Sequence, residues 1–231
     1  MDLSLAQFAL AIGVILVGSF IQSSIGFGLA IIAAPVLFFI EPLFVPAPIT
    51  VSALTLSLAN ARRHRHAISF TGLRAAIAGR IPGTVAGGLL LLLIDQQALA
   101  LWIGVTVLLA VVVSLTRIRV RPTNGALFSA GFLSGFMGTS SSIGGPPMAL
   151  VLQHETGDYI RANLAAFFVF SCVLSLAMLA LVGRFGMSEI LLSLPLMPAT
   201  LVGYWVAMRT LKYLPLGSVR LGSLLLCALA G

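Results

Sequence analysis

The chain of 231 residues is 59% hydrophobic and only 8% charged, and its mean hydropathy is +1.12. A water-soluble domain of this size needs more polar surface than such a composition supplies, so a soluble fold is excluded. The formal charge of +7 does not indicate nucleic-acid binding, because the basic residues stand in short gaps between apolar runs and act there as orientation signals. The sequence therefore predicts an all-α polytopic membrane protein.

The first half, residues 1–121, is expected to form a first transmembrane repeat that begins with a broken helical hairpin. Residues 4–24 are apolar, and residues 29–40 are apolar but shorter than the roughly 20 residues of a full crossing. Glycine tolerates the backbone conformations of a tight turn, so the hairpin is expected to turn at Gly26 and Gly28. The next apolar runs predict three transmembrane helices, at Leu43–Ala61, Gly72–Ile94 and Ala98–Thr116.

The second half, residues 122–231, retraces this plan as a second repeat. Its hairpin arms are expected at Ala126–Met137 and Pro147–Gln153. The three predicted transmembrane helices of this half are Tyr159–Gly183, Ser188–Met208 and Leu216–Gly231.

The two halves are expected to be inverted repeats. One constant shift along the chain lays Gly26 on Gly138 and Pro35 on Pro147. A hairpin returns the chain to its own side, so a hairpin plus three helices crosses the membrane an odd number of times. Two broken segments at matching places in two halves are the best sequence indication of a transporter binding site.

The basic residues predict the orientation. With the Arg62–His66 loop in the cytoplasm, the inverted arrangement places all but two of the 13 basic residues at the cytoplasmic face. The exceptions are Arg184, which lies outside, and Arg80, which lies within a predicted helix. Both termini and the Asp95–Gln97 turn are then expected outside.

The broken segments carry hydrogen-bond donors and no carboxylate, which favours an anion as ligand. Each second arm is expected to point the free N–H groups of its first turn at this ligand. Close packing between helices is the alternative role for such small residues. The candidate ligand residues are Gln22, Ser23, Ser24, Gly26 and Gly28 in the first segment, and Thr139, Ser140, Ser141, Ser142, Gly144 and Gly145 in the second.

Arg80 is a further candidate, because it lies about 12 Å into the predicted 72–94 helix, near Pro82 and Gly83, which are expected to interrupt that helix. No acidic residue is placed to pair with it, so either a bound anion balances its charge or its side chain extends to the cytoplasmic surface. Asn163, at the start of a predicted helix, is expected to line the cavity or to cap that helix.

Other chemistry is not indicated. His64, His66 and His154 stand at loop edges without metal-ligand spacing, so neither a metal site nor a cofactor is expected. No histidine lies within a predicted helix to activate a serine nucleophile, and no Walker motif is present. Cys172 and Cys227 lie in apolar runs, where cysteine usually serves as a small packing residue.

The second broken segment, Gly138-Thr-Ser-Ser-Ser-Ile-Gly-Gly-Pro-Pro147, with the later Arg161-Ala-Asn163-Leu, resembles the TauE/SafE family of sulfite and organosulfonate exporters. The first segment departs from the glycine triplet of that family and reads Ile25-Gly-Phe-Gly28. The resemblance extends over essentially the whole chain. It implies movement of small, often sulfur-containing anions across the bacterial inner membrane.

The sequence thus predicts a secondary transporter of small anions, working by alternating access at a site between the two hairpin tips. An anion channel, a membrane-embedded enzyme and an assembly factor are the alternatives. The expected partners are a small anionic substrate and membrane lipid. Proton or ion coupling and homo-oligomerisation stay open.

Overall fold

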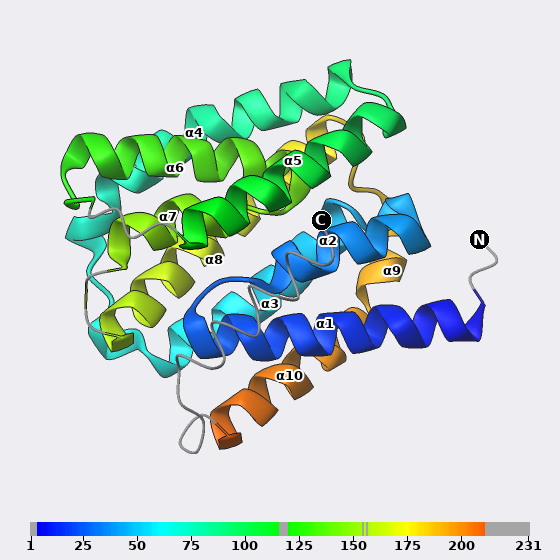
Figure 1. Ribbon diagram of the computed structural model, residues 1–231, viewed down its shortest axis with the longest axis horizontal. Coiled ribbons are helices and arrows are strands. Elements are labelled where there is room, and N and C mark those ends of the chain that lie inside the picture. Colours follow the sequence, from blue (N-terminus) through cyan, green and yellow to red (C-terminus); the bar gives the residue numbers. More distant parts are fainter. Residues whose placement is uncertain (1–3, 116–119, 154, 156, 211–231) are drawn as a thin grey trace.

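The computed structural model describes residues 4–115, 120–153, 155 and 157–210. These residues form helices that run mostly along the longest axis of the molecule, with no strand among them (Figure 1). The predicted all-α architecture is therefore confirmed. The last predicted transmembrane helix, Leu216–Gly231, lies outside the described residues.

The first half folds into five α-helices and two short 3-10 turns. The Ser4 side chain and Gln7 form a capping box that starts α1. The elements in chain order are α1 (Leu5–Ile25), α2 (Leu29–Ile40), η1 (Pro42–Phe44), α3 (Ala47–Arg63), η2 (Arg65–Ala67), α4 (Phe70–Leu93) and α5 (Gln96–Leu115).

The second half has a similar order of elements, with one break that the sequence analysis did not predict. The elements are α6 (Asn124–Ser141), α7 (Gly145–Leu152), α8 (Gly157–Leu181), α9 (Met187–Ser193) and α10 (Leu196–Thr210). Leu194 and Pro195 separate α9 from α10, where one continuous helix was expected. Proline has no N–H to continue the helical ladder, which explains the break.

Two helices are longer than expected. The predicted interruption at Pro82 and Gly83 is wrong, because α4 continues through both residues. Pro82 lies on an exposed side of α4. In the second half, α6 extends to Ser141, so the irregular backbone is confined to Ser142–Gly144.

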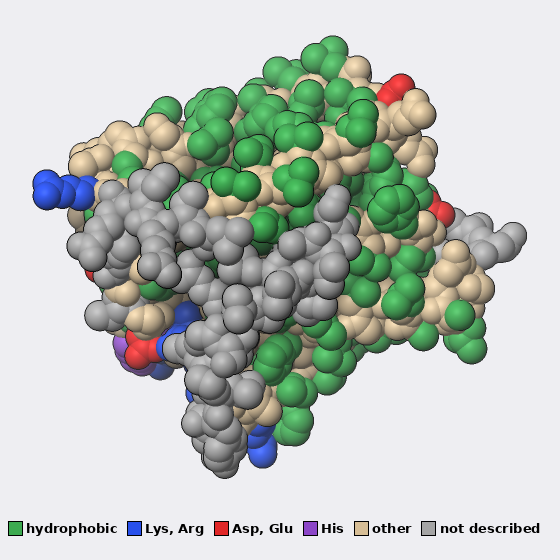
Figure 2. All heavy atoms as spheres, in the orientation of Figure 1, with side chains coloured by type: hydrophobic (Ala, Val, Ile, Leu, Met, Phe, Trp, Pro, Cys, Tyr) green, Lys and Arg blue, Asp and Glu red, His purple; other side chains and the backbone are tan. Residues whose placement is uncertain are grey.

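Six elements among the described residues are long and apolar enough to cross a membrane: α1, η1 with α3, α4, α5, α8, and α9 with α10. On the face seen in Figure 2, hydrophobic side chains cover most of the described surface. The Lys and Arg side chains visible there lie at the left and lower edges. The left end is where α3 ends and α4 begins, near the Arg62–His66 segment (Figure 1).

Among the helices that the structure describes, α4 and α6 make the tightest contact. A Cβ added at Gly79, Gly83 or Gly87 of α4 would lie 2.0, 2.1 and 2.5 Å from carbonyl oxygens of α6. A Cβ at Gly131 of α6 would lie 2.0 Å from the Ala76 carbonyl oxygen of α4. Small residues allow helix backbones in membranes to approach this closely, and side chains there would force them apart.

Two further helix pairs complete the arrangement. α1 packs along α10, where a Cβ at Gly203 would lie 2.4 Å from the Leu16 carbonyl oxygen. α3 packs along α8 in the middle of the molecule, between the α4–α6 pair and the α1–α10 pair (Figure 1). The α1–α2 and α6–α7 hairpins therefore contribute to the two outer pairs and face each other across α3 and α8.

We expect Gly83→Ala to destabilise the protein and Gly104→Ala to leave it as stable or slightly more stable. An alanine Cβ at Gly83 would meet the Phe132 carbonyl oxygen at 2.1 Å, whereas nothing lies within 4 Å of one at Gly104 on α5. Such overpacking typically costs about 1–3 kcal/mol, while alanine favours a free helix position by about 1 kcal/mol. Thermal unfolding in detergent measures both effects, and equal melting temperatures would contradict the contact.

Candidate functional site

Both hairpins turn through backbone in the left-handed region. In the first break, Gly26–Gly28, the two glycines have φ values of 98° and 127°. In the second break, Ser142–Gly144, Ser142 has a φ of 66°, which costs a non-glycine residue about 1 kcal/mol or more. The Ser142 hydroxyl donates a hydrogen bond of 2.8 Å to the Pro46 carbonyl oxygen, and this contact holds the second break against the start of α3.

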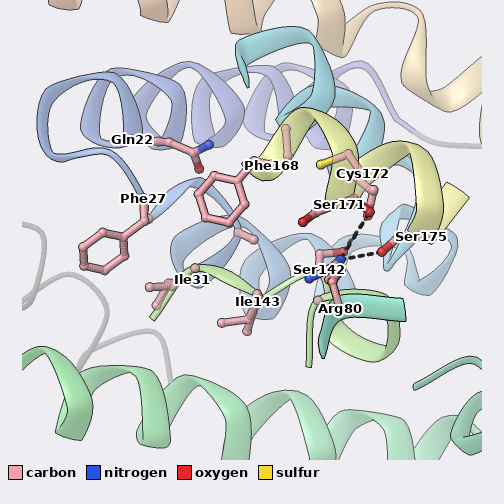
Figure 3. A pocket seen from close by; sticks show the side chains of 17 residues that line it. Gln22, Phe27, Ile31, Arg80, Ser142, Ile143, Phe168, Ser171, Cys172 and Ser175 are labelled. Carbon is pink, nitrogen blue, oxygen red and sulfur yellow. Dashed lines mark hydrogen bonds between the residues drawn. The ribbon is translucent and has the colours of Figure 1, made fainter. Parts of the chain in front are cut away.

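The two breaks line one central cavity together with α3, α4 and α8 (Figure 3). Its free volume is about 40 Å³, whereas one water needs about 10–15 Å³. The cavity therefore has room for two or three waters or one small oxyanion. The lining residues are Gln22, Phe27, Gly28, Ala30, Ile31, Thr50, Ala53, Arg80, Gly138, Ser142, Ile143, Gly144, Gly145, Phe168, Ser171, Cys172 and Ser175.

Among the described residues of this lining, Arg80 is the only charged one, and it is 3% exposed. Its Nη1 donates to the carbonyl oxygen and the hydroxyl of Ser134 on α6. Its Nη2 donates to the Ser171 carbonyl oxygen at 3.3 Å and to Ser175 Oγ at 2.7 Å, both on α8. The side chain therefore does not extend to the cytoplasmic surface, the alternative that the sequence analysis had left open.

The acceptors around Arg80 are all neutral. The one ion pair among the described residues joins Arg161 to Asp158, so no described carboxylate balances the Arg80 charge. A buried unbalanced charge is costly in a membrane protein and attracts a counter-ion. Because the Nη atoms are already engaged, they are not free for bidentate recognition of an anion. Arg80 instead supplies charge, and its Nε has no hydrogen-bond partner.

Hydroxyl groups supply the donors. Ser171 Oγ is buried, has no partner and belongs to a residue in the cavity lining. Ser175 Oγ accepts from Arg80 and forms a 2.8 Å hydrogen bond with Thr139 Oγ1. An anion beside Arg80 would find a positive charge and at least one free O–H group.

The glycines of the second hairpin fit closely around Arg80. A Cβ at Gly138 would lie 2.9 Å from Arg80 Nη1, and one at Gly144 would lie 3.1 Å from the same atom. The Gly144 position would also meet the Ser134 carbonyl oxygen at 2.8 Å. Any side chain at these glycines would push the guanidinium away from its hydrogen-bond partners.

The helix termini at the breaks offer fewer donors than expected. Pro146 and Pro147 stand in the first turn of α7 and have no N–H groups. In the first hairpin, the Leu29 N–H already donates to Gln22 Oε1 at 3.2 Å. Positive charge near the cavity therefore comes mainly from Arg80, with a smaller contribution from the helix termini.

The structure brings six of the predicted ligand residues to the central cavity. They are Gln22, Gly28, Arg80, Ser142, Gly144 and Gly145. Ser23 and Gly26 line a smaller chamber that adjoins this cavity.

The remaining predicted residues line neither space. The hydroxyls of Ser24, Ser140 and Ser141 donate to carbonyl oxygens of their own helices. Thr139 instead supports Ser175 by the hydrogen bond given above. Asn163 joins the start of α8 to the η2 segment, because it accepts from the Ser69 N–H and donates to the Ala67 carbonyl oxygen.

Sequence reasoning missed the contribution of α8. Ser171, Cys172 and Ser175 all face the cavity, and so does Phe168 (Figure 3). The spacing of Ser171 and Ser175 places two hydroxyls on one face of an apolar helix, which is the signal that could have identified them. Cys172 had been interpreted as a packing residue. It lines the cavity as well as being buried.

The comparison with known families decides between the functional classes. A family model described as "Sulfite exporter TauE/SafE" matches residues 10–231. The chain belongs to the TauE/SafE family. The resemblance stated from the sequence is thereby confirmed, and this TauE/SafE protein is a membrane transporter of the sulfite exporter type and not an enzyme. No curated protein and no solved structure matches the chain.

We expect Gly144→Ala in this TauE/SafE transporter to lower the affinity for sulfite by about tenfold, which corresponds to about 1.4 kcal/mol. The new Cβ would displace Arg80 Nη1 or the Ser134 backbone, as the distances above require. Gly125→Ala on α6 is the matched control, because nothing lies within 4 Å of a Cβ there. Calorimetric titration of both purified variants makes the comparison, and wild-type affinity in Gly144→Ala would contradict the close fit.

Proposed function

We propose that this protein is a secondary transporter that moves a small sulfur-containing oxyanion or organosulfonate across the bacterial inner membrane. The observation that carries this proposal is Arg80, a buried arginine with neutral partners, in a cavity between two broken hairpins. Membership of the TauE/SafE family supports the substrate class. The cavity binds the anion midway through transport, beside the positive charge and the free hydroxyl of Ser171.

The size of the cavity favours a small substrate. Its free volume of about 40 Å³ suits an inorganic oxyanion such as sulfite better than a longer organosulfonate. Part of the cavity wall is apolar and consists of Phe27, Ile31 and Phe168. An anion must lose part of its hydration shell to fit against these side chains. Arg80 offsets part of this dehydration cost.

Reciprocal helix contacts support two inverted repeats, over residues 1–121 and 122–231. α1 packs on α10, and α6 packs on α4, as an exchange of equivalent helices between halves requires. The two breaks also make equivalent contacts, each with a helix of the other half. Ser142 contacts Pro46 just before α3, and a Cβ at Gly26 would contact Leu164 in the first turns of α8. Such repeats are the usual basis of alternating access.

The narrow chamber next to the cavity favours a carrier over an anion channel. A channel needs a continuous wet path, whereas the chamber next to the cavity holds only about 10 Å³ of free space. A carrier binds its ion in a closed site and opens to one side at a time. Counterflow separates the two. In vesicles loaded with unlabelled sulfite, a carrier accumulates labelled sulfite from outside against the concentration gradient of the label, and a channel does not.

We expect Arg65→Cys to be labelled from the cytoplasm and Gln97→Cys from the periplasm, in a background without native cysteines. Both positions are exposed, Arg65 in η2 and Gln97 in the first turn of α5, and the basic cluster around Arg65 belongs inside. Membrane-impermeant thiol reagents added to intact cells and to inverted vesicles provide the measurement. Periplasmic labelling at residue 65 would contradict the proposed orientation.

We expect Arg80→Ala to weaken sulfite binding and uptake by about ten- to a hundred-fold, and Arg80→Lys to weaken them less. Losing an interaction with a charged group costs about 1.5–3 kcal/mol, and lysine keeps the charge without the two-helix contacts. Uptake by purified protein in liposomes, with sulfite, thiosulfate, taurine and acetate as a panel, provides the test.

Arg74→Ala is the matched control, since Arg74 is exposed on the same helix. No uptake of any panel anion by the wild type would contradict transport itself. Wild-type affinity in a folded Arg80→Ala variant would contradict only the role of Arg80.

A further inference from the structure

A second polar space adjoins the central cavity. This side chamber is lined by Gln22, Ser23, Gly26, Ser57, Asn60, Arg161, Ala165 and Phe168. Asn60 stands in the last turn of α3 and Arg161 in the first turns of α8, so the chamber lies toward the Arg62–His66 end. It connects the first break with the basic end of the molecule.

Three residues that line the side chamber each have a buried polar atom without a hydrogen-bond partner. These atoms are Ser23 Oγ, Ser57 Oγ and Asn60 Oδ1, and their residues are 1%, 1% and 6% exposed. An unsatisfied buried polar group costs about 1–3 kcal/mol unless a ligand or water serves it. The two hydroxyls can donate to an anion, and Asn60 Oδ1 can accept from water that accompanies it. The chamber is therefore suited to a partly hydrated polar occupant.

Charge at the outer end of the chamber is positive on balance. Arg161 pairs with Asp158 at 2.9 Å, and the Asp158 side chain is 74% exposed. His64 lies nearby, and burial together with the charge of Arg161 lowers its pKa. Arg62 and Arg63 end α3 beside them. Asp158 thus stands among several guanidinium groups, which would attract anions from the solvent on this side.

Gln22 and Phe168 line both the chamber and the central cavity, so these two residues lie at the boundary between the spaces. Phe168 is 8% exposed and packs edge-to-face on Phe167, with ring centroids 5.7 Å apart. In Figure 3 its ring lies on the side of the cavity nearer Gln22, and Arg80 with Ser175 lies on the opposite side. Because Phe168 also lines the side chamber, its apolar ring lies at the boundary of the two polar spaces.

We propose that the side chamber is the segment of the anion pathway between the central cavity and the Arg62–His66 face, and that Phe168 with Gln22 closes it in this conformation. This inference rests on the proposed transport function. The chamber holds about 10 Å³, roughly one water, so an anion enters it only after Phe168 moves. The alternative occupant of the chamber is a permanently buried water. In that case no anion passes through the chamber, and Phe168 does not close a pathway.

Native Cys172 gives a direct test, because its side chain lines the central cavity beyond Phe168. In a Cys227→Ser background, a membrane-impermeant maleimide is added to one side of sealed vesicles. Labelling of Arg65→Cys in parallel vesicles identifies the Arg62–His66 side. We expect Phe168→Ala to raise the rate of Cys172 labelling from that side at least tenfold and to leave labelling from the other side unchanged.

Phe170→Ala is the matched control, because Phe170 lies on the same helix and is 37% exposed. It should leave the labelling rate unchanged. Gln22→Ala is the second variant, and it should raise the rate from the Arg62–His66 side less than Phe168→Ala does. Gel filtration establishes that each variant is folded.

An unchanged rate from the Arg62–His66 side in both Phe168→Ala and Gln22→Ala would overturn the inference, as would an equal rise from both sides. Labelling does not depend on transport. Absence of sulfite uptake by the wild type would therefore overturn the proposed function, while side-specific labelling would still report whether Phe168 closes this path.

Discussion

The contact of α4 with α6 is the constraint on which the site depends. Glycines on both helices bring the backbones so close that added Cβ atoms would meet carbonyl oxygens at 2.0–2.5 Å. This closeness places Arg80 of α4 directly beside Ser134 and the second break. A wider spacing would move the guanidinium away from the cavity, so the glycines that pack the helices also position the charge.

The burial of Arg80 determines how strongly its charge attracts an anion. In water a guanidinium beside serine oxygens would be unremarkable, but in an apolar interior an unbalanced charge strongly favours a counter-ion. The protein satisfies the Nη donors with neutral groups of α6 and α8 and so holds the charge in place without cancelling it. Under the proposed function an anion binds and leaves beside this charge, which a carboxylate partner would prevent by competing for the same charge.

The irregular backbone of the two hairpins is confined to a few residues. Gly26, Gly28 and Ser142 take left-handed conformations, and the chain otherwise stays helical up to the cavity. In hydrocarbon such backbone must be buried in protein or face a polar space, and both breaks line the cavity. The first break also lines the side chamber, which makes the two breaks unequal in their surroundings.

The sequence by itself determined the helical membrane class and both hairpin turns, because apolar length, glycine and proline act locally. It also showed that Arg80 lies within an apolar helix without an acidic partner, and its motifs indicated the TauE/SafE family. Only the tertiary structure decided which hydroxyls reach the cavity. Ser140 and Ser141 turn back to their own helix, while Ser171 and Ser175 arrive from α8, distant in sequence. It also decided that α4 continues through Pro82. Helix rotation and packing set these outcomes, and no local pattern encodes them.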